Sequence, residues 1–309
     1  MARFSFFAEG LPGIDLEELK GKLIVLEGTD GVGRSTHITL LKQWLENNGH
    51  AVLDTGMTRS ALAGKRLRQA KEGHTLGGVT MSLFYTTDFA DRLENEMIPA
   101  LRAGFIVLTD RYIYSLMARA IVRGADPEWI KDVYGFALKP DAIFYLRVKI
   151  DDLITRVIQS TGFDYWESGM DLHLGEDMYD SFVEYQSRLL TQFDKMVEGY
   201  GFEVIDASGS IEDVFDDLKN RVSHALKNNR EIAPRGTKNW RPLLNGTICR
   251  LAFALSWASW IHRRDGRCDL PPRFAVSDPF AIPRAAGVPR QVGAARIAAA
   301  PLSRRWLDG

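Results

Sequence analysis

The chain alternates short runs, apolar except for Glu203 in the last of them, with longer stretches in which apolar residues recur at helical spacing. The five apolar runs occupy residues 23–26, 51–53, 105–108, 142–146 and 202–205. A run without polar alternation is typical of a strand that is buried on both faces, as in a parallel sheet. Because strands and helices alternate five times, the pattern predicts an α/β protein, a three-layer α/β/α sandwich with a five-stranded parallel sheet.

The stretches between the runs predict the helices. Besides the helices that follow the first two runs, helical spacing extends over residues 80–103, 114–123, 127–137, 151–160, 177–199 and 211–227. We expect Pro99 to kink the first of these. Residues 1–20 are expected to dock beside the first strand. Residues 162–176, rich in Gly, Asp and aromatic residues, suit a mobile lid.

A glycine-rich loop follows the first run and leads into a helix. Its sequence is Gly28-Thr29-Asp30-Gly31-Val32-Gly33-Arg34-Ser35-Thr36. The spacing is that of a phosphate-binding loop (P-loop), in which backbone N–H groups and a helix N-terminus cradle phosphate oxygens. Arg34 stands where the pattern has Lys, and the hydroxyl of Ser35 is a candidate Mg²⁺ ligand. The alternative is an ordinary glycine-rich turn before a helix.

A second polar group follows the third apolar run. Asp110 and Arg111 come at its carboxyl end, the edge at which ligands bind in open α/β sheets. Asp110 is a candidate for holding Mg²⁺ opposite Ser35, and Arg111 for clamping a phosphate with two hydrogen bonds. A structural Asp–Arg pair is the alternative. Arg59, just after the second run, is a further candidate for a ligand contact.

Charge divides the 309-residue chain into two parts. Residues 1–229 carry 25 Lys and Arg against 35 Asp and Glu, whereas residues 230–309 carry 14 against 5. The acidic first part argues against general nucleic-acid binding by the main domain. The second part, rich in Arg, Ala and Pro, is poor core material and is expected to be an irregular, poorly ordered C-terminal extension. A basic arm that contacts nucleic acid or membrane is the alternative.

Targeting signals are not evident. The N-terminus lacks a basic segment followed by a long apolar core, and both cysteines, Cys249 and Cys268, lie in the extension. The longest apolar stretch, residues 251–261, is shorter than the roughly 20 residues that a membrane-spanning helix needs. We therefore expect a cytoplasmic protein that does not enter a membrane.

Taken together, the motifs resemble the thymidylate kinase family. The resemblance rests on residues 27–36, Thr58-Arg59, Leu83-Phe84, the Asp-Arg-Tyr-x-x-Ser element from Asp110 to Ser115, and Lys139-Pro140-Asp141. Their order and spacing match over roughly residues 20–228. A P-loop containing Asp together with the Asp-Arg-Tyr-x-x-Ser element is fairly specific, although either alone is weak. Residues 1–229 are thereby identified as a P-loop nucleotide kinase domain.

The resemblance implies transfer of the γ-phosphoryl group of ATP to a nucleoside monophosphate, most simply dTMP, with Mg²⁺ as cofactor and a homodimer as the assembly. On the donor side it implies that residues 28–36 bind ATP, that residues 207–210 lie against the adenine, and that Ser35 and Asp110 hold the metal.

On the acceptor side, the resemblance places Asp30 near the sugar and phosphate, stacks Phe84 on the base and has Arg111 clamp the phosphate. The implied acceptor-binding residues are Asp30, Arg59, Phe84, Arg111 and Ser115. The implied catalytic residues are Arg34, Arg111 and Asp30.

Several positions depart from the family pattern. The base-reading Arg is missing or shifted to Arg92, Ala118-Arg119-Ala120 replaces Ala-Tyr-Gln, and the lid has no Arg or Lys from 157 to 187. If the lid supplies no cation to the transferred phosphate, Arg34 becomes more important for catalysis, unless Arg147, Arg156 or Arg188 reaches the site. A related kinase with a different acceptor, and a nucleotide-binding protein with little activity, are therefore alternatives.

Overall fold

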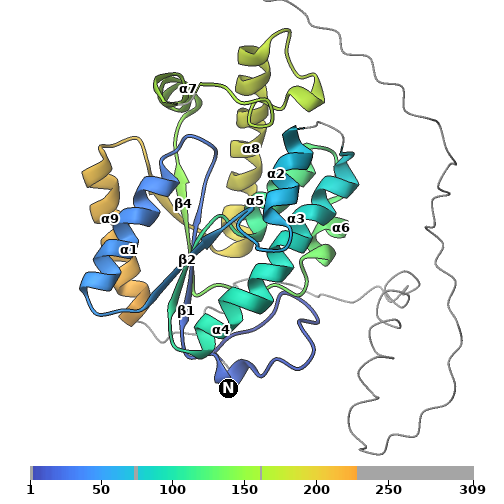
Figure 1. Ribbon diagram of the computed structural model, residues 1–309. Coiled ribbons are helices and arrows are strands. Elements are labelled where there is room, and N and C mark those ends of the chain that lie inside the picture. Colours follow the sequence, from blue (N-terminus) through green and yellow to red (C-terminus); the bar gives the residue numbers. More distant parts are fainter. Residues whose placement is uncertain (1–2, 73–75, 161, 228–309) are drawn as a thin grey trace, which may run out of the picture. The chain divides into compact units, whose positions relative to one another are not determined.

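The computed structural model describes residues 3–72, 76–160 and 162–227. In these ranges a five-stranded parallel sheet lies between two layers of helices (Figure 1). The sheet order is β2-β3-β1-β4-β5, with bounds β1 (Lys22–Glu27), β2 (Val52–Gly56), β3 (Ile106–Asp110), β4 (Ala142–Arg147) and β5 (Glu203–Asp206). Each strand overlaps one of the apolar runs, so the predicted three-layer α/β/α fold is confirmed. The predicted extension, 230–309, lies outside the described residues.

The helices divide between the two faces of the sheet. One face is covered by α1 (Arg34–Asn47), α7 (Ile150–Gln159) and α9 (Ile211–Lys227). The other is covered by α3 (Gly78–Arg92), α4 (Ile98–Arg102), α5 (Ile113–Val122), α6 (Pro127–Val133) and α8 (Met178–Tyr200). The remaining helix, α2 (Gly64–Glu72), packs against α3.

The burial of strand β1 on both faces explains why residues 23–26 include no polar residue. Leu23 and Val25 belong to the core cluster on one face of the sheet, whereas Ile24 and Leu26 belong to the cluster on the other face. All four side chains are fully buried. Successive residues of a strand point to opposite faces, and helices cover both faces here, so every position along the strand must be apolar.

The long helix predicted over residues 80–103 is interrupted. Between α3 and α4 lies a π-helical segment, Leu93–Met97, and Pro99 lies in the first turn of α4. Proline has no N–H to donate to the preceding turn, so the hydrogen-bonding pattern changes just before it. The expected disturbance at Pro99 therefore takes the form of a π-helical segment.

The N-terminal segment docks beside the first strand, as expected. Phe4 is buried in the same core cluster as Leu23, and Phe6 forms an antiparallel bridge with Leu138. Arg3 pairs with Asp141, whose carboxylate also accepts a hydrogen bond from the backbone N–H of Leu23. In the described ranges, no helix is both long and apolar enough to cross a bilayer.

Replacing a core leucine tests the two-sided burial of β1. Leu23→Ala should lower the free energy of unfolding by about 2–5 kcal/mol, because the surrounding side chains cannot completely fill the space left by the removed atoms. Leu62→Ala is the matched control, because Leu62 is 66% exposed, and it should change the free energy by no more than about 0.5 kcal/mol. Urea unfolding of both variants measures the difference; equal effects would contradict the described core.

Candidate active site

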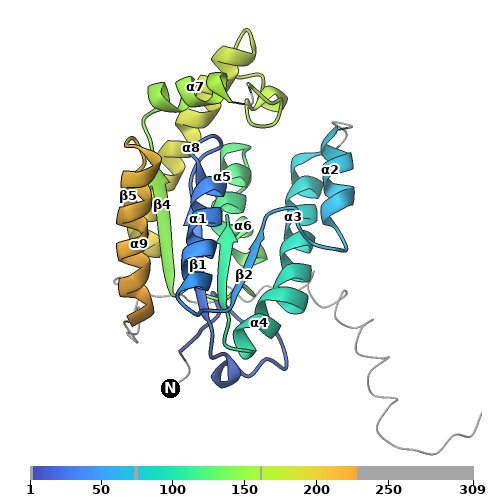
Figure 2. The same cartoon turned by 60° about the vertical axis from the view of Figure 1, so that its left-hand side comes forward.

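The site lies at the carboxyl edge of the sheet, where β1 and β3 end side by side. In their register Leu26 pairs with Asp110, so the end of β3 lies next to the start of the P-loop. Figure 2 shows α7 beyond this same edge of the sheet. The predicted phosphate loop and the predicted Asp110-Arg111 pair are therefore brought together.

The P-loop depends on glycine at two positions. Gly31 has a φ of +79°, and a Cβ added there would lie 2.5 Å from a methyl carbon of Val157 on α7. Gly33 has a φ of +95° and directly precedes α1. Other residues are strained in this left-handed region, so glycine permits both the turn and the contact with α7.

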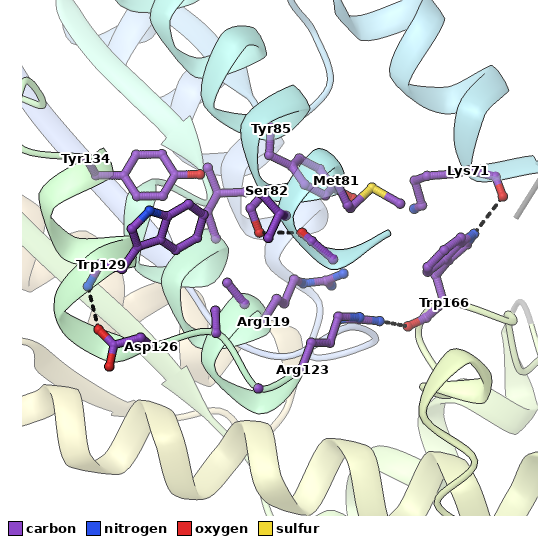
Figure 3. Close-up of a pocket in the computed structure, with 16 residues that line it drawn as sticks. Lys71, Met81, Ser82, Tyr85, Arg119, Arg123, Asp126, Trp129, Tyr134 and Trp166 are labelled. Atoms are coloured by element: carbon purple, nitrogen blue, oxygen red, sulfur yellow. Dashed lines mark hydrogen bonds between the residues drawn. The ribbon is translucent and has the colours of Figure 1, made fainter. Parts of the chain in front are cut away.

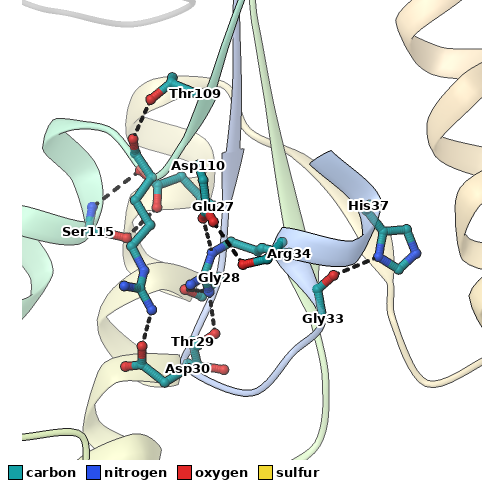
Figure 4. Close-up of polar contacts among 12 residues, drawn as sticks. Glu27, Gly28, Thr29, Asp30, Gly33, Arg34, His37, Thr109, Asp110 and Ser115 are labelled. Atoms are coloured by element: carbon teal, nitrogen blue, oxygen red, sulfur yellow. Dashed lines mark hydrogen bonds and ion pairs between the residues drawn. The ribbon is translucent and has the colours of Figure 1, made fainter. Parts of the chain in front are cut away.

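Arg34 is turned into its own loop. Its side chain is 6% exposed, and Nη1 donates to the carbonyl oxygens of Gly28 (2.6 Å) and Thr29 (Figure 4). Nε donates to Oδ1 of Asp110 at 2.8 Å. The planar guanidinium thus ties the beginning of the P-loop to the end of β3. A lysine ammonium is a single point of charge and does not reproduce this set of bonds.

Ser35 and Asp110, the two predicted metal ligands, are in contact. The Ser35 hydroxyl donates to Oδ2 of Asp110 at 3.1 Å. Burial alone would raise the pKa of Asp110, but the charges of Arg34 and Arg111 and the hydrogen bonds from Arg34 and Ser35 outweigh it and lower the pKa. Asp110 is therefore ionised at neutral pH.

Asp30 lies between two arginines. Its carboxylate is 3% exposed; Oδ1 accepts from Nη2 of Arg111 and Oδ2 accepts from Nη2 of Arg119. Burial would raise the pKa of Asp30, yet the charges of Arg111, Arg119 and Arg34 hold it well below its usual range. Asp30 is therefore ionised at every pH at which the protein would work.

The backbone of Arg111 is held in an unusual conformation. Its φ is +67°, which is uncommon for a residue other than glycine. The Arg111 N–H donates to the carbonyl of Leu26 at 2.9 Å, and the Thr109 hydroxyl donates to the carbonyl of Arg111 at 2.6 Å. Such strained residues cluster at binding sites, where the surrounding bonds fix them.

Glu27, the last residue of β1, anchors the beginning of α5. It is fully buried and accepts hydrogen bonds from the Ser115 hydroxyl and from the backbone N–H groups of Tyr112 (2.9 Å) and Ser115 (3.3 Å). Burial raises the pKa of Glu27 to about 7, although the bonds from Ser115 and Tyr112 act against it. Ser115, predicted to contact the acceptor, thus faces Glu27 inside the protein.

A cavity of about 420 Å³ lies next to Arg119, one of the two arginines that bind Asp30 (Figure 3). It is lined mainly by α3, α5 and α6, with Trp166 of the lid at one end. Lys71, Arg119 and Arg123 supply its cationic residues, and Tyr85, Trp129, Tyr134 and Trp166 its aromatic side chains. The sequence reasoning did not select these residues, although two arginines four positions apart just after the Asp-Arg-Tyr-x-x-Ser element are a usable signal.

Arg123 holds the lid against the cavity. It donates to both carboxylate oxygens of Asp171 (2.9 and 3.2 Å), to the carbonyl of Trp166 (3.1 Å) and to the hydroxyl of Tyr185. The indole N–H of Trp166 donates to the carbonyl of Lys71 in α2 at 2.9 Å. Although the lid has no cation of its own, a cation from α5 therefore holds it in place.

Two acceptor candidates, Phe84 and Arg59, are not among the residues that line the cavity. Phe84 is half-buried in a cluster with Leu67, Met81 and Trp166, and its neighbour Tyr85 lines the cavity instead. Arg59 pairs with Asp54 at 2.8 Å on the surface.

The base-reading Arg, expected to be missing or shifted to Arg92, stays a prediction. Arg92 has a fully buried side chain that pairs with Asp88 inside α3 and does not line the cavity.

Of the three possible lid cations, two are used on the surface. Arg147 pairs with Asp194, and Arg188 pairs with Glu184. Arg156 donates to the carbonyls of Ala207 (2.7 Å) and Val32 (3.5 Å), so it joins the P-loop to the loop after β5. That loop is the segment predicted to lie against adenine.

Comparison with known proteins agrees with this geometry. The family model described as Thymidylate kinase matches residues 26–218. The chain belongs to the thymidylate kinase family. It is 36% identical to "Probable thymidylate kinase 2" of Saccharolobus solfataricus, over 68% of this chain and 99% of the relative. It is 30% identical to "Thymidylate kinase" of Caldicellulosiruptor saccharolyticus, over the same shares. As a member of this family, the chain is a nucleoside monophosphate kinase, a phosphotransferase.

The buried carboxylate of this thymidylate kinase family member makes a testable contribution to its stability. Because the pKa of Glu27 is raised from 4.5 to about 7, the folded state holds a proton that the unfolded state releases. The stabilisation that comes from this proton on Glu27 is fully present below pH 4.5 and is lost as the pH rises through 7. The loss lowers the free energy of unfolding by on the order of 3 kcal/mol.

Glu27→Gln should therefore flatten the dependence of the unfolding free energy on pH between 5 and 8. Glu46→Gln, on the exposed side of α1, is the matched control and should keep the slope of the unchanged chain. Urea unfolding at several pH values measures both. Parallel curves for the unchanged chain and Glu27→Gln would contradict the buried, proton-binding carboxylate.

Proposed function

We propose that the chain transfers the γ-phosphoryl group of ATP to dTMP, giving ADP and dTDP in a Mg²⁺-dependent reaction. The observation that carries the proposal is the ion pair between Asp30 of the P-loop and Arg111 at the end of β3. Through the buried carboxylate of Asp30, the ion pair joins the P-loop, suited to the phosphates of ATP, to Arg111, which is suited to the phosphate of a second substrate. The printed names of the relatives supply the thymidylate acceptor.

On the donor side, the backbone of residues 28–36 would cradle the phosphates of ATP at the N-terminus of α1. Arg34 keeps the loop in shape through the carbonyls of Gly28 and Thr29 and contributes positive charge beside them. The loop after β5, held by Arg156, would lie against the adenine.

The contact between Ser35 and Asp110 suits a magnesium ion. One hydroxyl and one carboxylate oxygen, 3.1 Å apart, form a small set of hard oxygen donors. Mg²⁺ is usually held by one or two protein groups, with water and substrate phosphates as the other ligands. When bound, it would neutralise charge on the phosphates of ATP, and Arg34 would orient Asp110 through Oδ1.

On the acceptor side, Arg111 would clamp the dTMP phosphate and the cavity would take the base. An oxygen of that phosphate attacks the γ-phosphorus; the new P–O bond forms as the bond to the β-phosphate oxygen breaks, and ADP leaves. The chain needs no covalent intermediate, since phosphoryl transfer depends on positioning and charge neutralisation. Tyr85 takes the stacking role expected of Phe84, because Tyr85 lines the cavity. Arg59 and Ser115 remain proposed acceptor-side residues. Ser115 would act indirectly, through its hydrogen bond to Glu27.

A second candidate function is phosphorylation of another nucleoside monophosphate. It is favoured by the burial of Arg92, which leaves Arg119 and Arg123 as the arginines that line the cavity among the described residues. A nucleotide-binding protein with little activity is a weaker alternative, because Asp30, Arg34, Asp110 and Arg111 form one connected cluster. The kinase domain is proposed to span residues 1–229. The homodimer and the cytoplasmic location stay predictions.

An acceptor panel tests the proposed function. The full chain with ATP and Mg²⁺ should release ADP in the presence of dTMP, and much less with dCMP, AMP or GMP. The measurement is acceptor-dependent ADP formation in a coupled assay, with and without EDTA. Turnover with a different monophosphate would replace dTMP as the acceptor. No acceptor-dependent turnover at all would contradict the proposal.

Replacing Arg34 tests whether this arginine is the working cation. Arg34→Lys removes the fork that joins Gly28, Thr29 and Asp110. It should lower kcat by about a hundredfold to a thousandfold, the range for losing one well-placed group that stabilises charge. Arg147→Lys, at an exposed pair with Asp194, is the control and should leave kcat unchanged. A higher kcat for Arg34→Lys would contradict this role.

A further inference from the structure

Arg119 brings a second guanidinium to the buried carboxylate of the P-loop. It projects from α5 and lines the cavity (Figure 3). Its Nη2 donates to Oδ2 of Asp30, while Arg111 donates to Oδ1. The side chains of Arg119 and Arg111 are only 12% and 15% exposed. Two largely buried cations therefore share one carboxylate, and one of the two, Arg119, lines the cavity.

The charges around Asp30 do not cancel. Three arginines (Arg34, Arg111 and Arg119) face two aspartates, Asp30 and Asp110. The lid carboxylate Glu167 also interacts with this group, but burial and the charge of Asp30 raise its pKa to about 7, so it is only partly ionised at neutral pH. Within these ion pairs the arginines therefore outnumber the aspartates by one.

Arg111 and Arg119 also carry more N–H donors than their bonds to Asp30 use. Each guanidinium carries five N–H donors, and within the described residues the ion-pair partner of Arg119 is the shared Asp30. Nε of Arg111 is buried without a hydrogen-bond partner in the described structure. One arginine is enough to balance one aspartate, and a second buried cation is costly unless an anion joins it.

The other cations considered for the missing lid charge do not reach this place. Arg147 and Arg188 pair with carboxylates on the surface, and Arg156 binds carbonyls on the donor side of the P-loop. Arg123 is taken up by Asp171, Tyr185 and Trp166. Arg119 is thus the cation best placed to join Arg111 on the acceptor side.

We propose that Arg119 is a second arginine for the acceptor phosphate, held ready by Asp30 and joining Arg111 when a nucleoside monophosphate binds. It would supply, from α5, the positive charge that the lid lacks. A phosphate has enough oxygens to accept from both guanidiniums, and such charge-assisted bonds are among the strongest in proteins. The inference rests on the proposed function, because it assigns a residue to the acceptor half of the same site.

Comparing dTMP with thymidine tests the proposal, because the two ligands differ only in the phosphate. Isothermal titration calorimetry on the full chain should show that Arg119→Gln weakens dTMP binding by about 10- to 100-fold, the loss of one charged hydrogen bond. Thymidine binding should stay within about twofold. Arg119→Lys should recover part of the dTMP affinity, and the KM for ATP should not change. Arg147→Gln is the matched control and should behave as the unchanged chain.

Other outcomes would overturn the proposal. Equal weakening of dTMP and thymidine would place Arg119 on the base or sugar, and unchanged binding of both would leave it a purely structural partner of Asp30. Thermal unfolding of each variant checks that it folds, and Arg119→Lys carries the comparison if Arg119→Gln does not fold. Turnover by the unchanged chain tests the proposed function separately: without turnover that function fails, while the binding comparison still decides the role of Arg119. If the unchanged chain does not bind dTMP, both fail.

Discussion

The sharing of two buried aspartates among three arginines controls the arrangement of the site. Asp110 binds Arg34, and Asp30 binds both Arg111 and Arg119. These bonds join the P-loop, the end of β3 and helix α5. In surroundings with little water a buried charge must be paired, so each side chain has few alternative positions. The protein thereby holds in place, without a ligand, the groups that we propose to bind phosphate.

Glu27 extends this arrangement into the core. It ends β1, receives the backbone N–H groups at the beginning of α5 and thus sets the position of the helix that carries Arg119. Its raised pKa shows that burial opposes its charge, so the connection is made at a cost in stability at neutral pH. Next to Arg119 in the cavity, Arg123, which directly follows α5, holds the predicted lid through Asp171 and Trp166. Helix α5 therefore connects the P-loop to the lid.

The sequence allowed the fold and the position of the glycine-rich loop to be predicted, because both depend on local patterns. The apolar run of β1 identifies a strand that is covered on both faces, and the glycine spacing identifies the loop after it. What the sequence did not reveal depends on how side chains turn in space. Arg34 was expected to face a phosphate, yet its guanidinium lies on the carbonyls of its own loop. Phe84 and Tyr85 differ by one position, which is a rotation of about 100° around a helix, and only the packing of α3 decides which lines the cavity. Arg119 first looked like a departure from a motif, and its role became visible only with its distance from Asp30.

The central claim is that Arg111 and Arg119 together receive the acceptor phosphate from their position on Asp30. A crystal structure of the full chain with dTMP tests this claim most directly. The account predicts that N–H groups of both arginines lie within about 3.2 Å of phosphate oxygens, with the base in the cavity beside Tyr85. A structure in which Arg111 alone contacts the phosphate, while Arg119 stays on Asp30 or turns to the base, would contradict it.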